Sequence, residues 1–146
     1  MKQIHMAVGA LAITLNGIAG IYGGWRWWRV QSSVLFWRIL RAGQVVVVIE
    51  VVLGGVLILL GRKSPGLHTL YGVLPLLVSL IAEQLRVGTA QMVLDARGLE
   101  NAQAVAKLPE EEQRVVALSI VQREMGLMAL AAAVNTVLLA RAAGTA

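Results

Sequence analysis

Residues 43–61 read GQVVVVIEVVLGGVLILLG, and this stretch decides the fold class. Apart from Gln44 and Glu50 it contains only apolar residues and glycine. At a rise of about 1.5 Å per residue, a helix of this length spans close to the roughly 30 Å of a bilayer's hydrocarbon core. The charged and helix-breaking turn 62–66, Arg-Lys-Ser-Pro-Gly, follows directly. The stretch therefore predicts a transmembrane helix.

Three further stretches, about residues 5–25, 68–90 and 124–141, are also long and apolar enough to cross a bilayer. The composition agrees, because 58% of residues are apolar and only 14% are charged, whereas about a quarter are charged in soluble domains. We therefore expect an all-α polytopic membrane protein, a single domain over residues 1–146 built as an up-down bundle of four transmembrane helices.

The chain between the third and fourth spans predicts a helical extension outside the membrane. Pro109 followed by three acids, residues 110–112, is typical of a helix start. The helical pattern then continues to about Ala142, which corresponds to roughly 50 Å of helix, more than a bilayer requires. Residues 91–123 are therefore expected to form a hairpin extension of helices three and four.

The basic residues predict the orientation of this bundle. One side of the membrane carries Lys2, Arg62, Lys63 and Arg141, and the other carries Arg26, Arg29, Arg38, Arg41, Arg86, Arg97, Lys107, Arg114 and Arg123. The positive-inside rule places the richer side, with the hairpin extension, in the cytoplasm. We expect a multi-pass protein of the bacterial cytoplasmic (inner) membrane with both termini outside. The net charge of +5 flanks the spans, which favours anionic lipid headgroups of the bilayer over nucleic acid as partners.

Several classes of chemistry are excluded at this stage. Cysteine is absent, which excludes disulfides, thiolate metal sites and iron–sulfur clusters. The chain also contains no nucleotide-binding loop, nucleophile elbow or metalloprotease motif. Any chemistry must therefore come from the few polar groups within the spans, where each is a functional candidate by default.

Two of the predicted helices carry a narrow stripe of small and polar residues at steps of three and four. The stripe of helix one is His5, Gly9, Ala12, Asn16, Ala19 and Gly23; that of helix three is His68, Gly72, Pro75, Ser79, Ala82 and Arg86, with Glu83 beside it. In both, a glycine follows the histidine after four residues and a polar residue follows it after eleven. This correspondence suggests two helical hairpins of similar plan.

The two histidines predict a cofactor site at the outer side of the membrane. Helices one and three run in the same direction, so His5 and His68 are expected at the same depth. Two imidazoles on facing helices supply both axial ligands of a haem b iron, with Gly9 and Gly72 leaving room for the macrocycle. The turn residues 62–63, Arg62 and Lys63, would meet the propionates. The alternatives are helix packing through the small residues and a zinc or copper site, which needs further ligands.

The remaining polar residues predict a network through the bundle. Glu50 is expected at the depth of Asn16, where a hydrogen bond between them would fix the helix register; alternatively Glu50 carries protons or takes part in quinol chemistry, with a quinone as partner. Glu83 and Arg86 are expected to pair with each other or with residues 123–124 at the entry of helix four.

The segment Gly66-Leu67-His68-Thr69-Leu70-Tyr71-Gly72, with Leu74 to Ser79, Ala82 to Arg86 and on to Glu100, resembles small uncharacterised four-helix integral membrane proteins of bacteria. The resemblance implies a topology and no activity. A histidine with a glycine nearby is also similar, more loosely, to the helices of b-type membrane cytochromes.

Two functional hypotheses of different class follow. In the first, the chain is a bis-histidine haem b protein that transfers electrons or handles haem. In the second, it is a cofactor-free structural or accessory subunit, or an assembly factor, of a homo-oligomer or larger membrane complex. A transporter is a third option, for which four spans leave little room. Whether the chain is an enzyme stays open.

Overall fold

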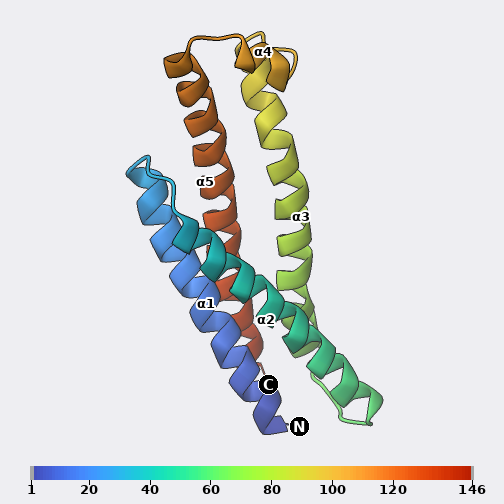
Figure 1. The fold of residues 1–146 in the computed structure, drawn as a ribbon. Coiled ribbons are helices and arrows are strands. Elements are labelled where there is room, and N and C mark those ends of the chain that lie inside the picture. Colours follow the sequence, from blue (N-terminus) through green and yellow to red (C-terminus); the bar gives the residue numbers. More distant parts are fainter. Residues whose placement is uncertain (1, 146) are drawn as a thin grey trace.

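The structure, a computed structural model, describes residues 2–145 as an assembly of helices (Figure 1). The elements are α1 (Lys2–Trp28), α2 (Val34–Leu59), α3 (Gly66–Ala96), α4 (Ala102–Ala106) and α5 (Glu110–Ala143). Helix accounts for 85% of the chain and the described residues contain no strand, which confirms the expected all-α class. As predicted, four helices, α1, α2, α3 and α5, are each long and apolar enough to cross a membrane.

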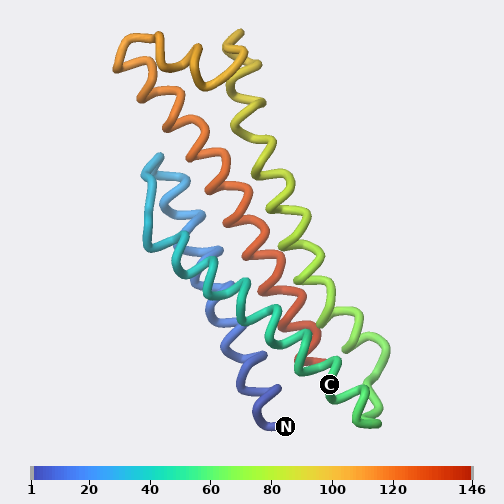
Figure 2. The backbone as a smooth tube through the Cα atoms, turned by 45° about the vertical axis from the view of Figure 1, so that its right-hand side comes forward, coloured from blue at the N-terminus to red at the C-terminus, as the bar shows by residue number. Residues whose placement is uncertain are grey.

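Helix α5 is the centre of the arrangement. It lies between α1 and α3 and packs on both, while α2 packs on α1 and crosses toward α3 (Figures 1 and 2). In α5, 44% of the apolar stretch is buried, against 11% to 17% in the other three long helices. Helices α3 and α5, joined through α4, continue past the α1–α2 turn, so one end of the molecule consists of these elements alone (Figure 1).

Helix α2 begins at Val34, nine residues before the start predicted from the apolar stretch at 43. Ser33 caps this start, because its Oγ accepts a hydrogen bond from the Phe36 N–H at 3.2 Å. The Tyr22 hydroxyl lies 3.1 Å from the same Oγ. The turn between α1 and α2 is therefore only residues 29–33, and the two helices lie directly against each other in opposite directions.

Close contacts at glycines set the register of α1 against α2. The facing pairs are Gly23 with Phe36, Asn16 with Gly43, and Gly9 with Glu50. Each step of seven residues back along α1 is matched by seven residues forward along α2, the repeat of a coiled-coil seam. The approach is tightest at Gly23, where an added Cβ would lie 2.3 Å from the Phe36 ring.

Small residues also bring α1 close to α5. A Cβ on Gly20 would lie 3.0 Å from the backbone nitrogen of Ala133, and one on Gly126 would lie 2.6 Å from Nε1 of Trp27. Such backbone approach at small residues is how helices associate in lipid, where there is no hydrophobic gain from burying one apolar side chain against another. At Gly23, a member of the small stripe, a Cβ would lie 3.0 Å from the Cβ of Ala129 as well as against Phe36, so α2 and α5 both contact this stripe.

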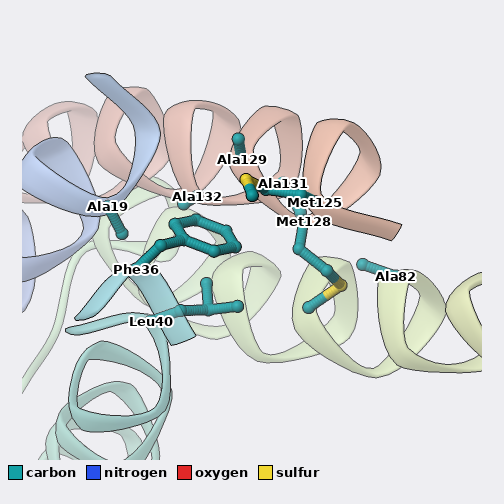
Figure 3. Packing of buried hydrophobic residues seen from close by; sticks show 9 residues of the cluster. All are labelled: Ala19, Phe36, Leu40, Ala82, Met125, Met128, Ala129, Ala131 and Ala132. Atoms are coloured by element: carbon teal, nitrogen blue, oxygen red, sulfur yellow. The ribbon is translucent and has the colours of Figure 1, made fainter. Parts of the chain in front are cut away.

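Buried apolar side chains form separate clusters along the bundle. The largest contains Ala19, Phe36, Leu40, Ala82, Met125, Met128, Ala129, Ala131 and Ala132, with the Phe36 ring surrounded largely by alanine and methionine (Figure 3). A small cluster of Ala12, Val47 and Leu139 lies nearer the start of α1, and a third, of Val93, Leu94 and Val116, joins α3 to α5 in the extension. The core is thus divided into layers.

Large apolar side chains also cover the outside of the helices. Val52 is 58% exposed, Leu130 is 64% exposed and Ile21 is 80% exposed. Exposed apolar surface of this extent is unfavourable in water, whereas the hydrocarbon of a bilayer is an equivalent environment for it. The surface agrees with four helices suited to a membrane.

We predict that Gly23→Ala destabilises the protein by about 1–3 kcal/mol, because the new methyl group would overlap the fully buried Phe36 ring. The matched control is Gly24→Ala, one residue along the same helix, where an added Cβ meets nothing within 4 Å. There the better helix propensity of alanine makes the change neutral or slightly stabilising. Thermal unfolding in detergent compares the two variants, and equal midpoints would contradict the predicted register.

Candidate functional site

The structure brings both histidines and Glu50 together at one end of the bundle; we call these three residues the His–Glu site. Nδ1 of His5 lies 3.1 Å from Oε1 of Glu50. The His5 and His68 rings are 6.0 Å apart between centroids, at an angle of 76°. Nδ1 of His68 lies 2.9 Å from the carbonyl oxygen of Ala142. Groups from α1, α2, α3 and α5 therefore meet at this point.

The expected hydrogen bond between Glu50 and Asn16 is wrong. The Asn16 amide instead donates to the carbonyl oxygen of Ala12 at 2.9 Å, and the backbone facing Asn16 is that of Gly43. The cause is the earlier start of α2, which shifts its midpoint toward the amino terminus. Glu50 thus lies past the middle of α2 and faces His5 and Gly9, at the amino-terminal end of the α1 stripe.

The contact between His5 and Glu50 is close but not fully satisfied. Their side chains are only 18% and 12% exposed. Within residues 2–145, His5 Nδ1 and Glu50 Oε2 are buried without a hydrogen-bond partner, so the 3.1 Å contact lacks hydrogen-bond alignment. Buried polar atoms of this kind are costly unless a proton or another partner reaches them, which marks the pair as a place for proton or ligand chemistry.

The donor set at the His–Glu site was compared with the needs of a haem. Two imidazoles from different helices suit axial ligation, and pairing of His68 Nδ1 with a carbonyl oxygen leaves its other nitrogen as the ligating atom. The space expected over the α1 stripe is occupied, however, because a Cβ on Gly9 would lie 2.7 Å from Glu50. Of the two glycines expected to leave room for the macrocycle, Gly72 alone has open space, because a Cβ there meets nothing within 4 Å. The residues therefore do not fit a macrocycle lying on α1.

Two other expectations concern the surroundings of the histidines. Arg62 and Lys63 are exposed in the turn between α2 and α3. Among residues 2–145, no group of three or more histidine, cysteine, aspartate or glutamate side chains is arranged to hold a metal ion. The third ligand that zinc or copper would need beside the two histidines is thus not in place.

A second polar group lies at the centre of the bundle. Nδ2 of Asn135 donates to Oγ of Ser79 at 2.9 Å, and Ser79 donates to the carbonyl oxygen of Pro75 at 2.8 Å. Asn135 is 2% exposed and Ser79 is 8% exposed. This bond links α3 to α5 inside an apolar core, where such bonds help to select one pairing of helices. The sequence indicated Ser79 as a polar residue of the α3 stripe, but not its contact with Asn135.

A third polar group surrounds Glu83 at the other end of the four-helix region. Glu83 forms an ion pair with Arg41 of α2, accepts a hydrogen bond from Gln44 at 3.0 Å and pairs with Arg86 at 3.0 Å. Arg86 also lies 3.5 Å from the Glu124 carboxylate. The Glu83–Arg86 and Arg86–Glu124 pairs were expected. The group ties α2, α3 and α5 together.

Sequence reasoning missed the part of this group that α2 supplies. The guanidinium carbons of Arg86 and Arg41 lie 5.7 Å and 6.0 Å from the centre of the Trp37 ring, within the range of cation–π attraction. Trp37, Arg41 and Gln44 are spaced at steps of four and three, which places them on one helix face. This spacing was the available signal, but it is visible only once α2 is known to begin before residue 37.

Comparison with known proteins adds no family to these observations. A scan against protein-family models, a search of curated proteins and a search of solved structures each found no match to this chain. The function must therefore be argued from the geometry of the polar groups.

We predict that Glu83→Gln lowers the free energy of unfolding by about 1–2 kcal/mol, because Arg41 and the partly buried Arg86 lose their common carboxylate, which is itself only 26% exposed. Glu111→Gln is the matched control, since its pair with Arg114 joins side chains that are 80% and 70% exposed and contributes little. Denaturation in detergent measures both variants. A loss at Glu111 as large as that at Glu83 would contradict the assigned role.

Proposed function

We propose that this chain is a four-span protein of the bacterial cytoplasmic membrane, in which α1, α2, α3 and α5 cross in alternating directions. Both termini then lie outside, and the end made of α3, α4 and α5 lies in the cytoplasm. The proposal is supported by four helices of sufficient length and apolarity, by the shared end of the molecule at which α1 begins and α5 stops (Figure 1), and by the distribution of lysine and arginine.

We propose further that the His–Glu site is a proton-exchanging site at the outer end of this bundle. The observation that carries the proposal is the 3.1 Å contact between His5 Nδ1 and Glu50 Oε1, with His68 beside it. Ionisable side chains within membrane helices characteristically form proton relays, and histidine is the side chain best suited to changing its charge near neutral pH.

One proton is the exchanged species. When it resides on Nδ1 of His5, the pair is an imidazolium and a carboxylate; when it resides on Oε1 of Glu50, both groups are neutral. This internal transfer leaves the net charge of the pair at zero, so it avoids burying an isolated charge. Release of the proton to the outer side leaves a Glu50 carboxylate beside a neutral His5, and uptake of a proton restores the neutral pair. His68, held by the Ala142 carbonyl, stands close enough to His5 to exchange protons through one water molecule.

The route toward the cytoplasm is closed by apolar packing. Ala12, Val47 and Leu139 are at most 4% exposed and form one cluster. Each follows the His–Glu site inward along its own helix, α1, α2 and α5 respectively. The site therefore takes up and releases protons on the outer side only. This suits an accessory subunit that serves a larger membrane complex. A candidate reaction partner is a quinol, which releases two protons and two electrons when an electron acceptor of that complex oxidises it to the quinone.

Infrared difference spectra between acidic and alkaline samples in nanodiscs test the site. We expect a carboxyl stretching band from Glu50 whose amplitude changes between acidic and alkaline pH. The band should be absent in Glu50→Gln. His5→Gln should shift the band, because the neighbouring nitrogen is replaced by an amide. The control, Glu124→Gln, removes a carboxylate at the opposite end and should leave the band in place. A Glu50 band that stays constant at all pH values would refute proton exchange.

Proton flux tests the closed inner route. In proteoliposomes with an imposed pH gradient, the wild type should dissipate the gradient no faster than empty vesicles. Val47→Ser places a hydroxyl group in the apolar cluster and is expected to raise the leak, whereas Val45→Ser, on the exposed side of the same helix, is not. Proton conduction by the wild-type protein would refute a site open to one side only and indicate a pathway across the bilayer.

Haem binding on the open Gly72 side of His68, away from the occupied face of α1, is the second candidate. It is favoured by the carbonyl that holds Nδ1 of His68, the arrangement typical of a ligating histidine. Absorption spectra of the purified protein, oxidised and reduced, test it. A Soret band that is lost in His68→Gln and kept in Glu83→Gln would establish haem binding and replace the proton proposal. The absence of a Soret band from protein isolated from haem-supplied cells would exclude haem binding.

A further inference from the structure

A polar hollow lies between α3 and α5 in the part of the molecule that continues past the α1–α2 turn. Its volume is about 280 Å³, and it is lined by Val93, Ala96, Arg97, Ser119, Gln122 and Arg123. Val93, which is 3% exposed, belongs to the cluster that joins the two helices below the hollow. The floor is thus held by packed side chains of both helices, while the rim carries the polar groups.

The charge of the hollow has one sign. Two arginines line it and no carboxylate does. Within residues 2–145, neither Arg97 nor Arg123 forms an ion pair, whereas the neighbouring Glu124 pairs with Arg86. Asp95, the nearest acid in the sequence on α3, accepts a hydrogen bond from the Gln91 side chain at 2.7 Å. Both guanidinium groups therefore keep donors for another acceptor.

One of the two arginines is already held at the hollow by the protein. Nη2 of Arg97 donates to Oγ of Ser119 at 3.2 Å, and Ser119 donates in turn to the carbonyl oxygen of Val115 at 2.8 Å. A side chain held in this way loses less conformational freedom when it binds a ligand. The Gln122 amide adds a further donor at the same rim. The hollow therefore combines two cations with neutral hydrogen-bonding groups.

We infer that this hollow binds a phosphate group through Arg97 and Arg123. The planar guanidinium fork matches the oxygens of phosphate, and such charge-assisted pairs are stronger than neutral hydrogen bonds. The phosphate belongs either to an anionic lipid headgroup or to a free phosphate ion. The lipid source rests on the proposed membrane placement, because Arg97 lies seven residues, or about 10 Å of helix, beyond the end of the span expected over residues 68–90. The free ion does not depend on it.

Isothermal titration calorimetry on the full chain in a neutral detergent tests the inference. The probes are inorganic phosphate, short-chain phosphatidylglycerol and, as a zwitterionic comparison, short-chain phosphatidylcholine. The wild type should bind at least one of the first two, and the affinity should fall with added salt. The double variant Arg97→Gln/Arg123→Gln should bind about 25-fold more weakly, at roughly five-fold per arginine.

Arg114→Gln is the matched control, since it removes one positive charge from the exposed surface of α5, the helix that carries Arg123. It should change the affinity less than two-fold. Binding of phosphatidylglycerol alone identifies a lipid headgroup, and binding of inorganic phosphate identifies the free ion as sufficient. Arg97→Lys/Arg123→Lys keeps the positive charges but removes the planar guanidinium groups, so it should bind with intermediate affinity. This variant replaces the glutamine variant as the test if the latter unfolds.

The inference is overturned if neither anionic probe binds, if phosphatidylcholine binds as tightly as phosphatidylglycerol, or if the arginine variants bind like the wild type. Because the hollow and the His–Glu site lie at opposite ends of the molecule and are tested by different probes, failure of one leaves the other unaffected.

Discussion

The close approach of α1 and α2 at glycine determines most of what the rest of the molecule does. Gly23 has no side chain, so the Phe36 ring fills its place, directly after the short turn at residues 29–33. Glu50 is thereby carried to His5 at the end of the bundle where α1 begins. A shift of one helical turn toward Ala12 would face the carboxylate with apolar side chains, where it would be unpaired and costly.

Helix α5 completes each polar layer that α3 begins. It provides the Ala142 carbonyl to His68, the Asn135 amide to Ser79, and Glu124 to Arg86. Apolar clusters separate these layers. The two helix pairs are therefore joined by different kinds of contact. Helices α1 and α2 pack mainly by shape, with large side chains against small ones, whereas α3 and α5 are joined by polar pairs at three depths.

The apolar stretches were enough to predict four long helices, because a helix that crosses hydrocarbon must be apolar along most of its length. The small stripe of α1 also indicated a buried face. The Glu50 partner could not be predicted, since it depends on the first residue of α2, which Ser33 sets by capping. Arg41 was missed for a related reason: it is 42 residues from Glu83 in sequence, and no local pattern reports such a contact.

The central place of α5 has a consequence for how the chain is made. The ribosome synthesises α5 after the other three long helices, so the α1–α2 hairpin can form while the faces of α1 and α3 that α5 will cover are still open. Until α5 packs, Ser79 and His68 lack their native partners on that helix. The last helix to be made is therefore the one that completes the polar contacts of α3.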